Sequence, residues 1–119
     1  MKNNFDIIYK ISTNSSDLPI TEFVKFLQRV FPSSGWNEKF FLWKHFENPC
    51  GVSILVWAIS NDEIVGFRAM WKMNLKKDEE IILAYQPCDT AVLKEYRGRG
   101  IFSKMTKIAR KKALEEGSD

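Results

Sequence analysis

The spacing of apolar residues at the start of the chain predicts a strand with one buried face. Apolar and polar positions alternate there, a period of two that is typical of a half-buried strand. The residues of the buried face are Phe5, Ile7, Tyr9 and Ile11. Ile8 is the one apolar residue on the opposite face, and a polar loop over residues 12–17 follows.

The period then changes to that of an amphipathic helix. Its apolar residues are spaced three and four apart, so they share one helical face. They are Phe23, Phe26, Leu27, Val30 and Phe31. Pro32 ends this helix, because proline lacks the N–H that a continuing helix requires.

A second helix is predicted after a short break, with Ser34 or Asn37 as its N-cap and an end before Pro49. Its aromatic residues are Phe40, Phe41, Trp43 and Phe46. A stripe at this spacing favours packing in the core over a role in the wall of a pocket. For His45, on the same helix, a hydrogen-bonded place at the surface is favoured over a place in a binding pocket.

The second half of the chain begins with a predicted β-hairpin. Residues 52–59 are almost all apolar and rich in β-branched side chains, which predicts a strand buried on both faces. A turn over residues 60–63 leads to a return strand over residues 64–75. Residues 76–80 are charged and are expected to form a solvated turn.

A further strand and a helix complete the predicted order βααβββα. The strand spans residues 81–93, but Pro87 cannot donate to a ladder and predicts a break or bulge, with the part from Cys88 onward leading into a loop. The helix spans residues 102–116. Its apolar side consists of Ile101, Met105, Ile108, Ala109 and Ala113.

Composition limits the class of protein. A chain of 119 residues that is 45% hydrophobic has enough apolar side chains for one domain. The net charge of +3 is too small to indicate nucleic-acid binding by itself. The N-terminus lacks the apolar stretch of a signal peptide, and no segment reaches the roughly 20 apolar residues of a membrane helix. We therefore expect a cytoplasmic protein without nucleic-acid or membrane partners.

The cysteines and the histidine do not indicate a metal site. Cys50, Cys88 and His45 lack the spacing of zinc ligands. We expect no metal and two buried or half-buried thiols in a reducing compartment.

The candidate binding site is the glycine-rich turn between the last strand and the last helix. Gly98 and Gly100 permit backbone angles that a Cβ forbids, and they let a ligand approach the main chain. The following helix directs its unpaired N–H groups and the positive end of its dipole at this turn. Arg97 and Arg99 add positive charge. Together these features predict an anion site, most often one for phosphate.

This turn resembles the pyrophosphate loop of the GCN5-related N-acetyltransferase (GNAT) superfamily. Arg97 and Gly100 match the pattern Arg-x-x-Gly-x-Gly/Ala, and residues 91–105 are similar to the family's central strand, loop and helix in unbroken order. Phe102 departs from the final small residue of the pattern, and in this it resembles a bacterial subgroup in which phenylalanine commonly stands there. The resemblance extends to residues 43–51, where Trp-Lys, Asn-Pro and Gly precede the first hairpin strand.

The resemblance implies the fold and the cofactor. It implies an α/β (α+β) fold in which a mixed, mostly antiparallel sheet is flanked by helices, formed by a single domain over residues 1–119. It implies acetyl-CoA as co-substrate, with its pantetheine arm at the edge of the last strand and its pyrophosphate on the loop. The expected contacts are Val92, Leu93, Arg97, Gly98, Arg99, Gly100, Ile101, Phe102 and Ser103.

A GNAT domain normally continues beyond this helix with a fifth strand, a fourth helix and a final hairpin. The sequence ends before them, so the strand that leads into the loop is expected to have an unpaired edge. Two explanations are open. A second copy or a separate chain completes the sheet, which predicts a homo-oligomer or a complex, or the sequence is a fragment of a longer enzyme.

Acetyl transfer from a thioester to an amine requires no covalent enzyme intermediate, so no Ser-His-Asp or Cys-His set is expected. Asp89, near the predicted strand break, is the candidate base, acting directly or through a water; a purely structural role is also open. Asp62 and Glu63, at the hairpin turn, are weaker candidates. Ser103 is expected to cap the helix or to bind phosphate.

Three classes of function follow from these observations. The favoured one is an N-acetyltransferase that transfers an acetyl group from acetyl-CoA to a primary amine of a small-molecule acceptor in a ternary complex. The second is a truncated CoA-binding fragment or subunit without activity of its own. The third is a small basic adaptor for nucleic acid or anionic surfaces. The acceptor stays open among amino sugars, polyamines, amino-acid derivatives and protein N-termini.

Overall fold

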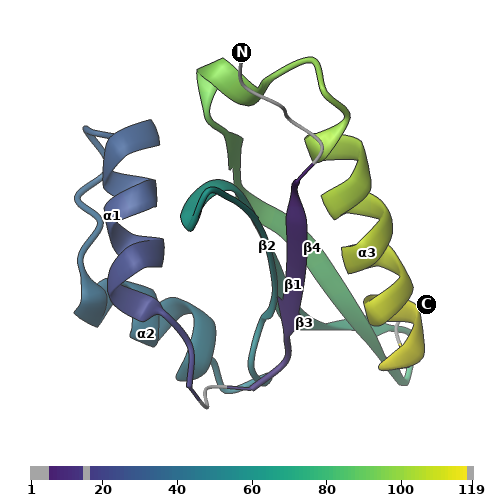
Figure 1. Ribbon diagram of the computed structural model, residues 1–119. Coiled ribbons are helices and arrows are strands. Elements are labelled where there is room, and N and C mark those ends of the chain that lie inside the picture. The colour runs from purple at the N-terminus through teal and green to yellow at the C-terminus, as the bar shows by residue number, and fades with distance from the viewer. Residues whose placement is uncertain (1–5, 15–16, 118–119) are drawn as a thin grey trace.

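The computed structural model describes residues 6–14 and 17–117, which form one antiparallel sheet with helices on both faces (Figure 1). The strands are β1 (Ile8–Ser12), β2 (Ile54–Ser60), β3 (Glu63–Lys77) and β4 (Glu80–Val92), in the spatial order β1-β2-β3-β4. The helices are α1 (Ile20–Val30), α2 (Glu38–Phe46) and α3 (Ile101–Glu115). The predicted order βααβββα and a sheet flanked by helices are confirmed. The prediction was a mixed, mostly antiparallel sheet, and all three strand pairs among the described residues are antiparallel.

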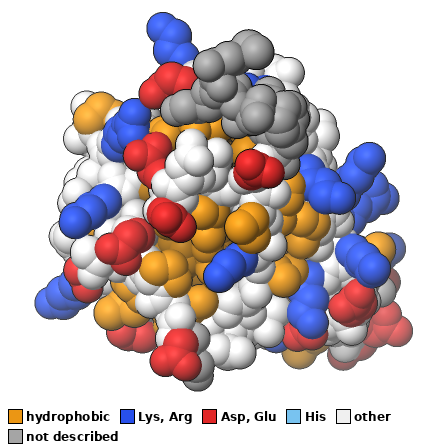
Figure 2. All heavy atoms as spheres, in the orientation of Figure 1, with side chains coloured by type: hydrophobic (Ala, Val, Ile, Leu, Met, Phe, Trp, Pro, Cys, Tyr) orange, Lys and Arg blue, Asp and Glu red, His pale blue; other side chains and the backbone are white. Residues whose placement is uncertain are grey.

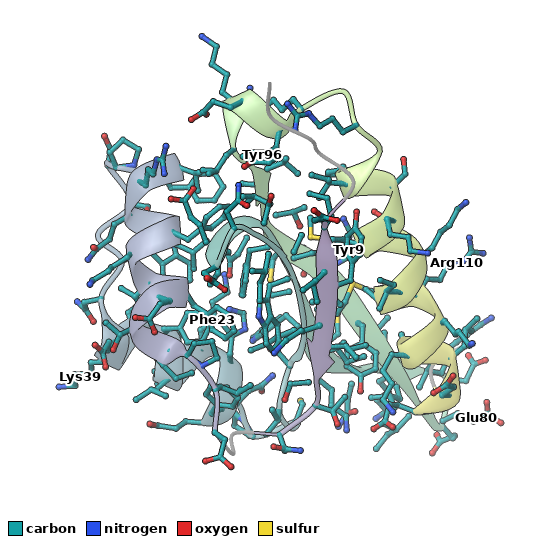
Figure 3. All side chains as sticks on the ribbon, viewed as in Figure 1. Tyr9, Phe23, Lys39, Glu80, Tyr96 and Arg110 are labelled. Carbon is teal, nitrogen blue, oxygen red and sulfur yellow. The ribbon has the colours of Figure 1, made fainter. Side chains whose placement is uncertain are left out.

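One face of the sheet packs against α1 and α2, and an aromatic cluster forms this side of the core. Phe23 points from α1 toward the sheet (Figure 3), where its ring lies 4.8 Å from Trp57 and 5.1 Å from Phe67 between centroids. Because both faces of the sheet are covered, β2 is buried on both sides, as its apolar run predicts.

The other face of the sheet packs against α3, and the helix turns its predicted apolar side toward the sheet. Ile101, Met105, Ala109 and Ala113 are buried, while Ile108 is only partly so. Gly66 on β3 makes this approach possible, because a Cβ at that position would lie 3.1 Å from the side chains of both Ile101 and Met105. The close contact fixes where α3 begins relative to β3.

The turn regions differ in part from expectation. The β2–β3 hairpin turns at Asn61 and Asp62, whose φ angles of 52° and 60° are those of a tight hairpin turn. The charged segment after β3 is shorter than predicted, because the strands run to Lys77 and resume at Glu80. The solvated turn is therefore confined to the two residues between these strands.

The predicted break at Pro87 is wrong in position. β4 passes through Pro87 without interruption, because within the described residues it is an edge strand, where proline is tolerated. The register shift lies just beyond, where Asp89 and Thr90 together oppose Arg68 of β3. Asp89 has a φ of 52°, so the bulge turns this carboxylate out of the regular strand alternation.

The first strand is less buried than its alternation predicts. Of the predicted buried face, Ile11 is 41% exposed and Ile7 and Tyr9 are only half-buried. Ile8, predicted on the opposite face, is 57% exposed. Figure 2 shows apolar side chains exposed in the middle of this face, where Figure 1 places β1. The reason is that β1 is a short edge strand, which α3 covers only in part. Phe5 lies outside the described residues.

The second helix is capped by Asn37, whose side chain accepts a hydrogen bond from the N–H of Phe40 at 2.8 Å. Of its aromatic residues, Phe41 is fully buried, but Phe40 is 36% and Trp43 58% exposed. The core prediction is therefore right for Phe41 and wrong for Phe40 and Trp43. Only one side of this short helix meets the sheet, and both rings lie outside that contact.

The contact between α3 and β3 can be tested with Gly66→Val. The added isopropyl group, whose Cβ alone would lie 3.1 Å from both side chains, would enter the space that Ile101 and Met105 occupy, so we expect the free energy of unfolding to fall by about 1–3 kcal/mol. Urea denaturation measures the change. Asn74→Val, at an exposed position of the same strand, is the control and should change stability far less. Equal stabilities for the two variants would contradict this packing.

Candidate functional site

The turn between β4 and α3 has the backbone that its glycines predict. Gly98 has a φ of 81° and Gly100 a φ of 79°, which lie in the left-handed region that glycine adopts without steric cost. Gly100 is the N-cap of α3, and no side chain caps the helix. The expectation that Ser103 caps it is wrong, because the cap position falls on a residue without a side chain. The first N–H groups of α3 are therefore left for a ligand or solvent.

A cavity of about 540 Å³ lies at this turn, between the C-terminus of α1, the end of β4 and the N-terminus of α3. Of the predicted contacts, it is lined by Val92, Arg97, Gly98, Gly100, Ile101, Phe102 and Ser103. Residues that the sequence did not indicate complete it: Val30, Phe31, Thr90, Ala91 and Tyr96. We call this the loop cavity.

Two of the predicted contacts lie outside the loop cavity. Leu93 is buried, its N–H bonds to the carbonyl oxygen of Val65 and its own carbonyl accepts from Tyr96. Arg99 instead places its guanidinium 4.8 Å from the centre of the Tyr96 ring. Arg97 lines the cavity and also holds the loop to the strand, because its Nε donates to the carbonyl oxygen of Val92 at 3.2 Å.

A second group of polar residues surrounds the bulge in β4. The Asp89 carboxylate accepts hydrogen bonds from Nε2 of His45 at 3.0 Å and from Nζ of Lys44 at 3.1 Å. On its other side His45 places Nδ1 2.8 Å from the hydroxyl oxygen of Ser53. His45 is fully buried, so the expectation of a surface position is wrong. We call these four residues the bulge cluster.

Burial sets the charges of the bulge cluster. It lowers the pKa of His45 below its ordinary value, although the bond to Asp89 acts in the opposite direction. A neutral imidazole donates from Nε2 to Asp89 and accepts at Nδ1 from Ser53. For Asp89, burial alone raises the pKa, but the hydrogen bonds from His45 and Lys44 outweigh it and the net pKa is lowered. Asp89 is therefore an ionised carboxylate at neutral pH.

A second cavity, of about 340 Å³, opens next to the bulge cluster against α2. Its lining residues are Phe40, Trp43, Lys44, Trp71, Gln86 and Cys88. We call it the aromatic cavity, since three rings line it. Trp71 is held by its indole N–H, which donates to the carbonyl oxygen of Lys44 at 3.1 Å. The exposed rings of α2 thus belong to a cavity, the reading that the sequence disfavoured.

The two cysteines form no disulfide with each other. Cys50 and Cys88 are free and half-buried, as expected. Burial raises the pKa of the Cys88 thiol to about 12, so it stays protonated at neutral pH and is a poor nucleophile.

The described residues contain no group of three or more acidic, histidine or cysteine side chains arranged to hold a metal ion. None of the helices in residues 6–14 and 17–117 is long and apolar enough to cross a membrane.

The sequence comparison decides the family. A family model described as an acetyltransferase (GNAT) domain matches residues 13–119. The chain belongs to the GNAT acetyltransferase family. Comparison with curated proteins gives no significant match.

Solved structures agree with this GNAT domain in fold. A ribosomal-protein-alanine N-acetyltransferase from Brucella melitensis superposes with a TM-score of 0.66 at 18% identity, covering 95% of this chain and 75% of that one. A predicted acetyltransferase with acetyl-CoA from Clostridium acetobutylicum gives 0.72 at 16% identity, covering 95% and 77%. An aminoglycoside acetyltransferase from an uncultured soil sample, in complex with sisomicin, gives 0.68 at 17% identity, covering 95% and 73%.

Family membership makes the chain an acyltransferase enzyme by class. One solved structure of the same fold, the Clostridium acetobutylicum protein, contains acetyl-CoA. The residues at the turn fit such a ligand. Left-handed glycines, an uncapped helix N-terminus and a cavity beside a strand edge suit a molecule with a pyrophosphate and an extended arm.

The buried imidazole gives the GNAT domain a measurable pH dependence. Because the pKa of His45 is lowered on folding, the unfolded chain takes up a proton near pH 6.5 before the folded chain does. The free energy of unfolding should therefore fall as the pH drops from 7.5 to 5.5, by at most about 1.4 kcal/mol per pH unit for one proton. Urea denaturation at several pH values measures this slope.

The variant His45→Gln shows whether the imidazole causes this pH dependence, because His45 is the single histidine of the chain. This variant should be less stable at pH 7.5 by about 1–3 kcal/mol, because Ser53 and Asp89 lose a partner. It should also lose most of the pH slope between 7.5 and 5.5. If both proteins show the same slope, the imidazole is not the group responsible.

Proposed function

We propose that this GNAT domain transfers an acetyl group from acetyl-CoA to the primary amine of a small-molecule acceptor. The observation that carries the proposal is the loop cavity, where the left-handed turn at Gly98 and Gly100 meets the uncapped start of α3. The proposal includes a cytoplasmic location and no nucleic-acid partner.

The proposed cofactor contacts are mainly groups at the turn that the domain does not already use in its own hydrogen bonds. The N–H groups at the start of α3 and the Arg97 side chain are placed to bind a pyrophosphate. The arm would run along the main chain of Thr90 to Val92 and not at Leu93, because both main-chain groups of Leu93 are bonded within the domain. The Val92 carbonyl oxygen already accepts from Nε of Arg97, so it would have to accept a second hydrogen bond or give up the first. The thioester of the bound cofactor supplies the activated acetyl group.

The aromatic cavity is the proposed place of the acceptor. Its volume of about 340 Å³ suits a small molecule. Its rings offer apolar contact. Lys44, which lines the cavity, donates to the Asp89 carboxylate, and this carboxylate would be the partner for an ammonium group. Structural neighbours whose names specify an aminoglycoside or a ribosomal-protein alanine show that this fold accommodates several amine acceptors.

Asp89 is proposed to take up the proton that the amine loses, directly or through a water. Lys44 and His45 hold its carboxylate in one orientation at the bulge. Their hydrogen bonds lower the pKa of Asp89, which makes the carboxylate a strong partner for an ammonium group and a weak base. Transfer through a water chain to bulk solvent suits such a carboxylate.

The open edge of β4 is proposed to pair with further polypeptide in the functional assembly. β4 is an edge strand within the described residues, and apolar edges invite pairing. We favour a second copy of the chain as one partner. Sedimentation showing a stable, fully folded monomer at all concentrations would count against that partner.

Turnover is the direct test of the proposed reaction. A thiol-release assay with acetyl-CoA and a panel of amino sugars, polyamines, amino-acid derivatives and peptide N-termini should show release that depends on one class of small amine. If acetyl-CoA binds but no amine in the panel supports thiol release, the chain is a CoA-binding module without activity of its own.

The role of Asp89 can be tested with Asp89→Asn. The amide keeps the size of the side chain but loses the charge, so we expect kcat to fall about 100-fold or more while binding of acetyl-CoA is retained. Steady-state kinetics measures this. Asp62→Asn, at the exposed hairpin turn, is the matched control and should keep the parent kcat. A parent-like kcat in Asp89→Asn would exclude the proposed role.

The loop can be tested with Gly100→Val. The position is open to solvent, but its φ of 79° is strained for a β-branched residue, and the side chain would block approach to the N–H groups of α3. We expect calorimetric titration to show loss of acetyl-CoA binding. Gly117→Val imposes comparable strain at the other end of α3, where φ is 95° and the space is also open, and should bind normally. Equal binding by both variants would reject the loop assignment.

A further inference from the structure

Arg68 is a cation that is only 8% exposed. Its buried Nε has no hydrogen-bond partner in the described part of the chain. The carboxylates of residues 6–14 and 17–117 form no ion pair with it. An unpaired buried charge is costly, and proteins retain one mainly where a ligand or partner satisfies it.

The position of Arg68 relates it to the loop cavity. It stands opposite the bulge at Asp89 and Thr90, and it shares the α3 face of β3 with Gly66, two residues away. Its guanidinium carbon lies 5.4 Å from the centre of the Phe102 ring. Phe102 lines the loop cavity and is 55% exposed. Arg68 is not itself a lining residue of the cavity, and the Phe102 ring connects it to the lining.

Phe102 gives the Arg68 guanidinium an aromatic neighbour. The face of an aromatic ring attracts a cation and offers it a partial substitute for water. Phe102 and Arg68 are thus one feature of this chain, formed by the first turn of α3 and the middle of β3.

We infer that Arg68 is a binding residue for the carbonyl oxygens of the extended arm of acetyl-CoA. This inference rests on the proposed function. Arg68 lies opposite Thr90 of β4, and Thr90 precedes the glycine turn in the chain. In the proposed complex Arg68 would therefore be near the arm and not near the pyrophosphate. A guanidinium presents several donors in one plane, which suits the amide and thioester oxygens of an arm that runs along a strand edge.

The variant Arg68→Met separates this role from a structural one. Methionine fills similar space without the charge, so the melting temperature should stay the same or rise. The Kd of acetyl-CoA should increase about tenfold or more through the loss of charged hydrogen bonds. The Kd of adenosine 3′,5′-bisphosphate, which carries phosphates but no arm, should stay within about twofold of the parent value. Calorimetric titration measures both constants.

Arg110→Met is the control, because Arg110 projects from the outer side of α3 (Figure 3), and it should leave both constants unchanged. If Arg68→Met binds acetyl-CoA like the parent protein, the inference is overturned while the proposed function stands. The same holds if both ligands weaken equally, since Arg68 would then act at the phosphates. If the parent protein binds neither ligand, the proposed function fails and the inference with it.

Discussion

The structure depends on the chain reversal that joins an edge strand to the N-terminus of α3. Two left-handed residues, Gly98 and Gly100, bring α3 back onto the sheet, and Gly66 lets it approach β3 closely. Because a helix N-terminus carries unpaired N–H groups and a partial positive charge, this reversal places donors that suit an anion at the end of β4. The loop cavity is therefore a consequence of how the sheet and α3 are connected.

The bulge in β4 divides the candidate site into two chemically different parts. Beyond it, toward the glycine turn, lies the loop cavity with its main-chain donors; before it lies the aromatic cavity against α2. In the chain, Asp89 lies between Cys88, which lines the aromatic cavity, and Thr90, which lines the loop cavity, and Lys44 and His45 hold its carboxylate. The proposed direct transfer between two bound substrates would use the main-chain donors on one side of the bulge and the aromatic walls on the other.

The sequence predicted those features that depend on neighbours in the chain. Helical periodicity identified α1 and α3, the apolar run identified β2, and the glycine spacing identified the turn. It failed where distant segments meet. His45 bonds to Asp89 across 44 positions and Trp71 bonds to Lys44 across 27, and no local pattern encodes either contact. The one feature of the sequence that pointed to this part of the site was the pair Trp43-Lys44 near the end of α2, which belongs to the family resemblance.

The error at Pro87 has a different physical origin. Proline disrupts a central strand, and the sequence alone does not tell that β4 has no neighbour on one side among the described residues. The buried position of Arg68 was likewise hidden, since arginine within a strand ordinarily indicates a solvated face. Both cases show that the place of a strand in the sheet decides what its side chains meet.

The central claim is that the turn between β4 and α3 binds acetyl-CoA. The most direct measurement is a titration of isotope-labelled protein with acetyl-CoA, followed through the backbone amide resonances. If the turn binds acetyl-CoA, the resonances of the amides at Thr90 to Val92 and at Gly98 to Ser103 should shift most. The shifts should saturate with a single dissociation constant. A folded protein whose amides at these positions do not respond, or respond less than those of another surface, would contradict this claim.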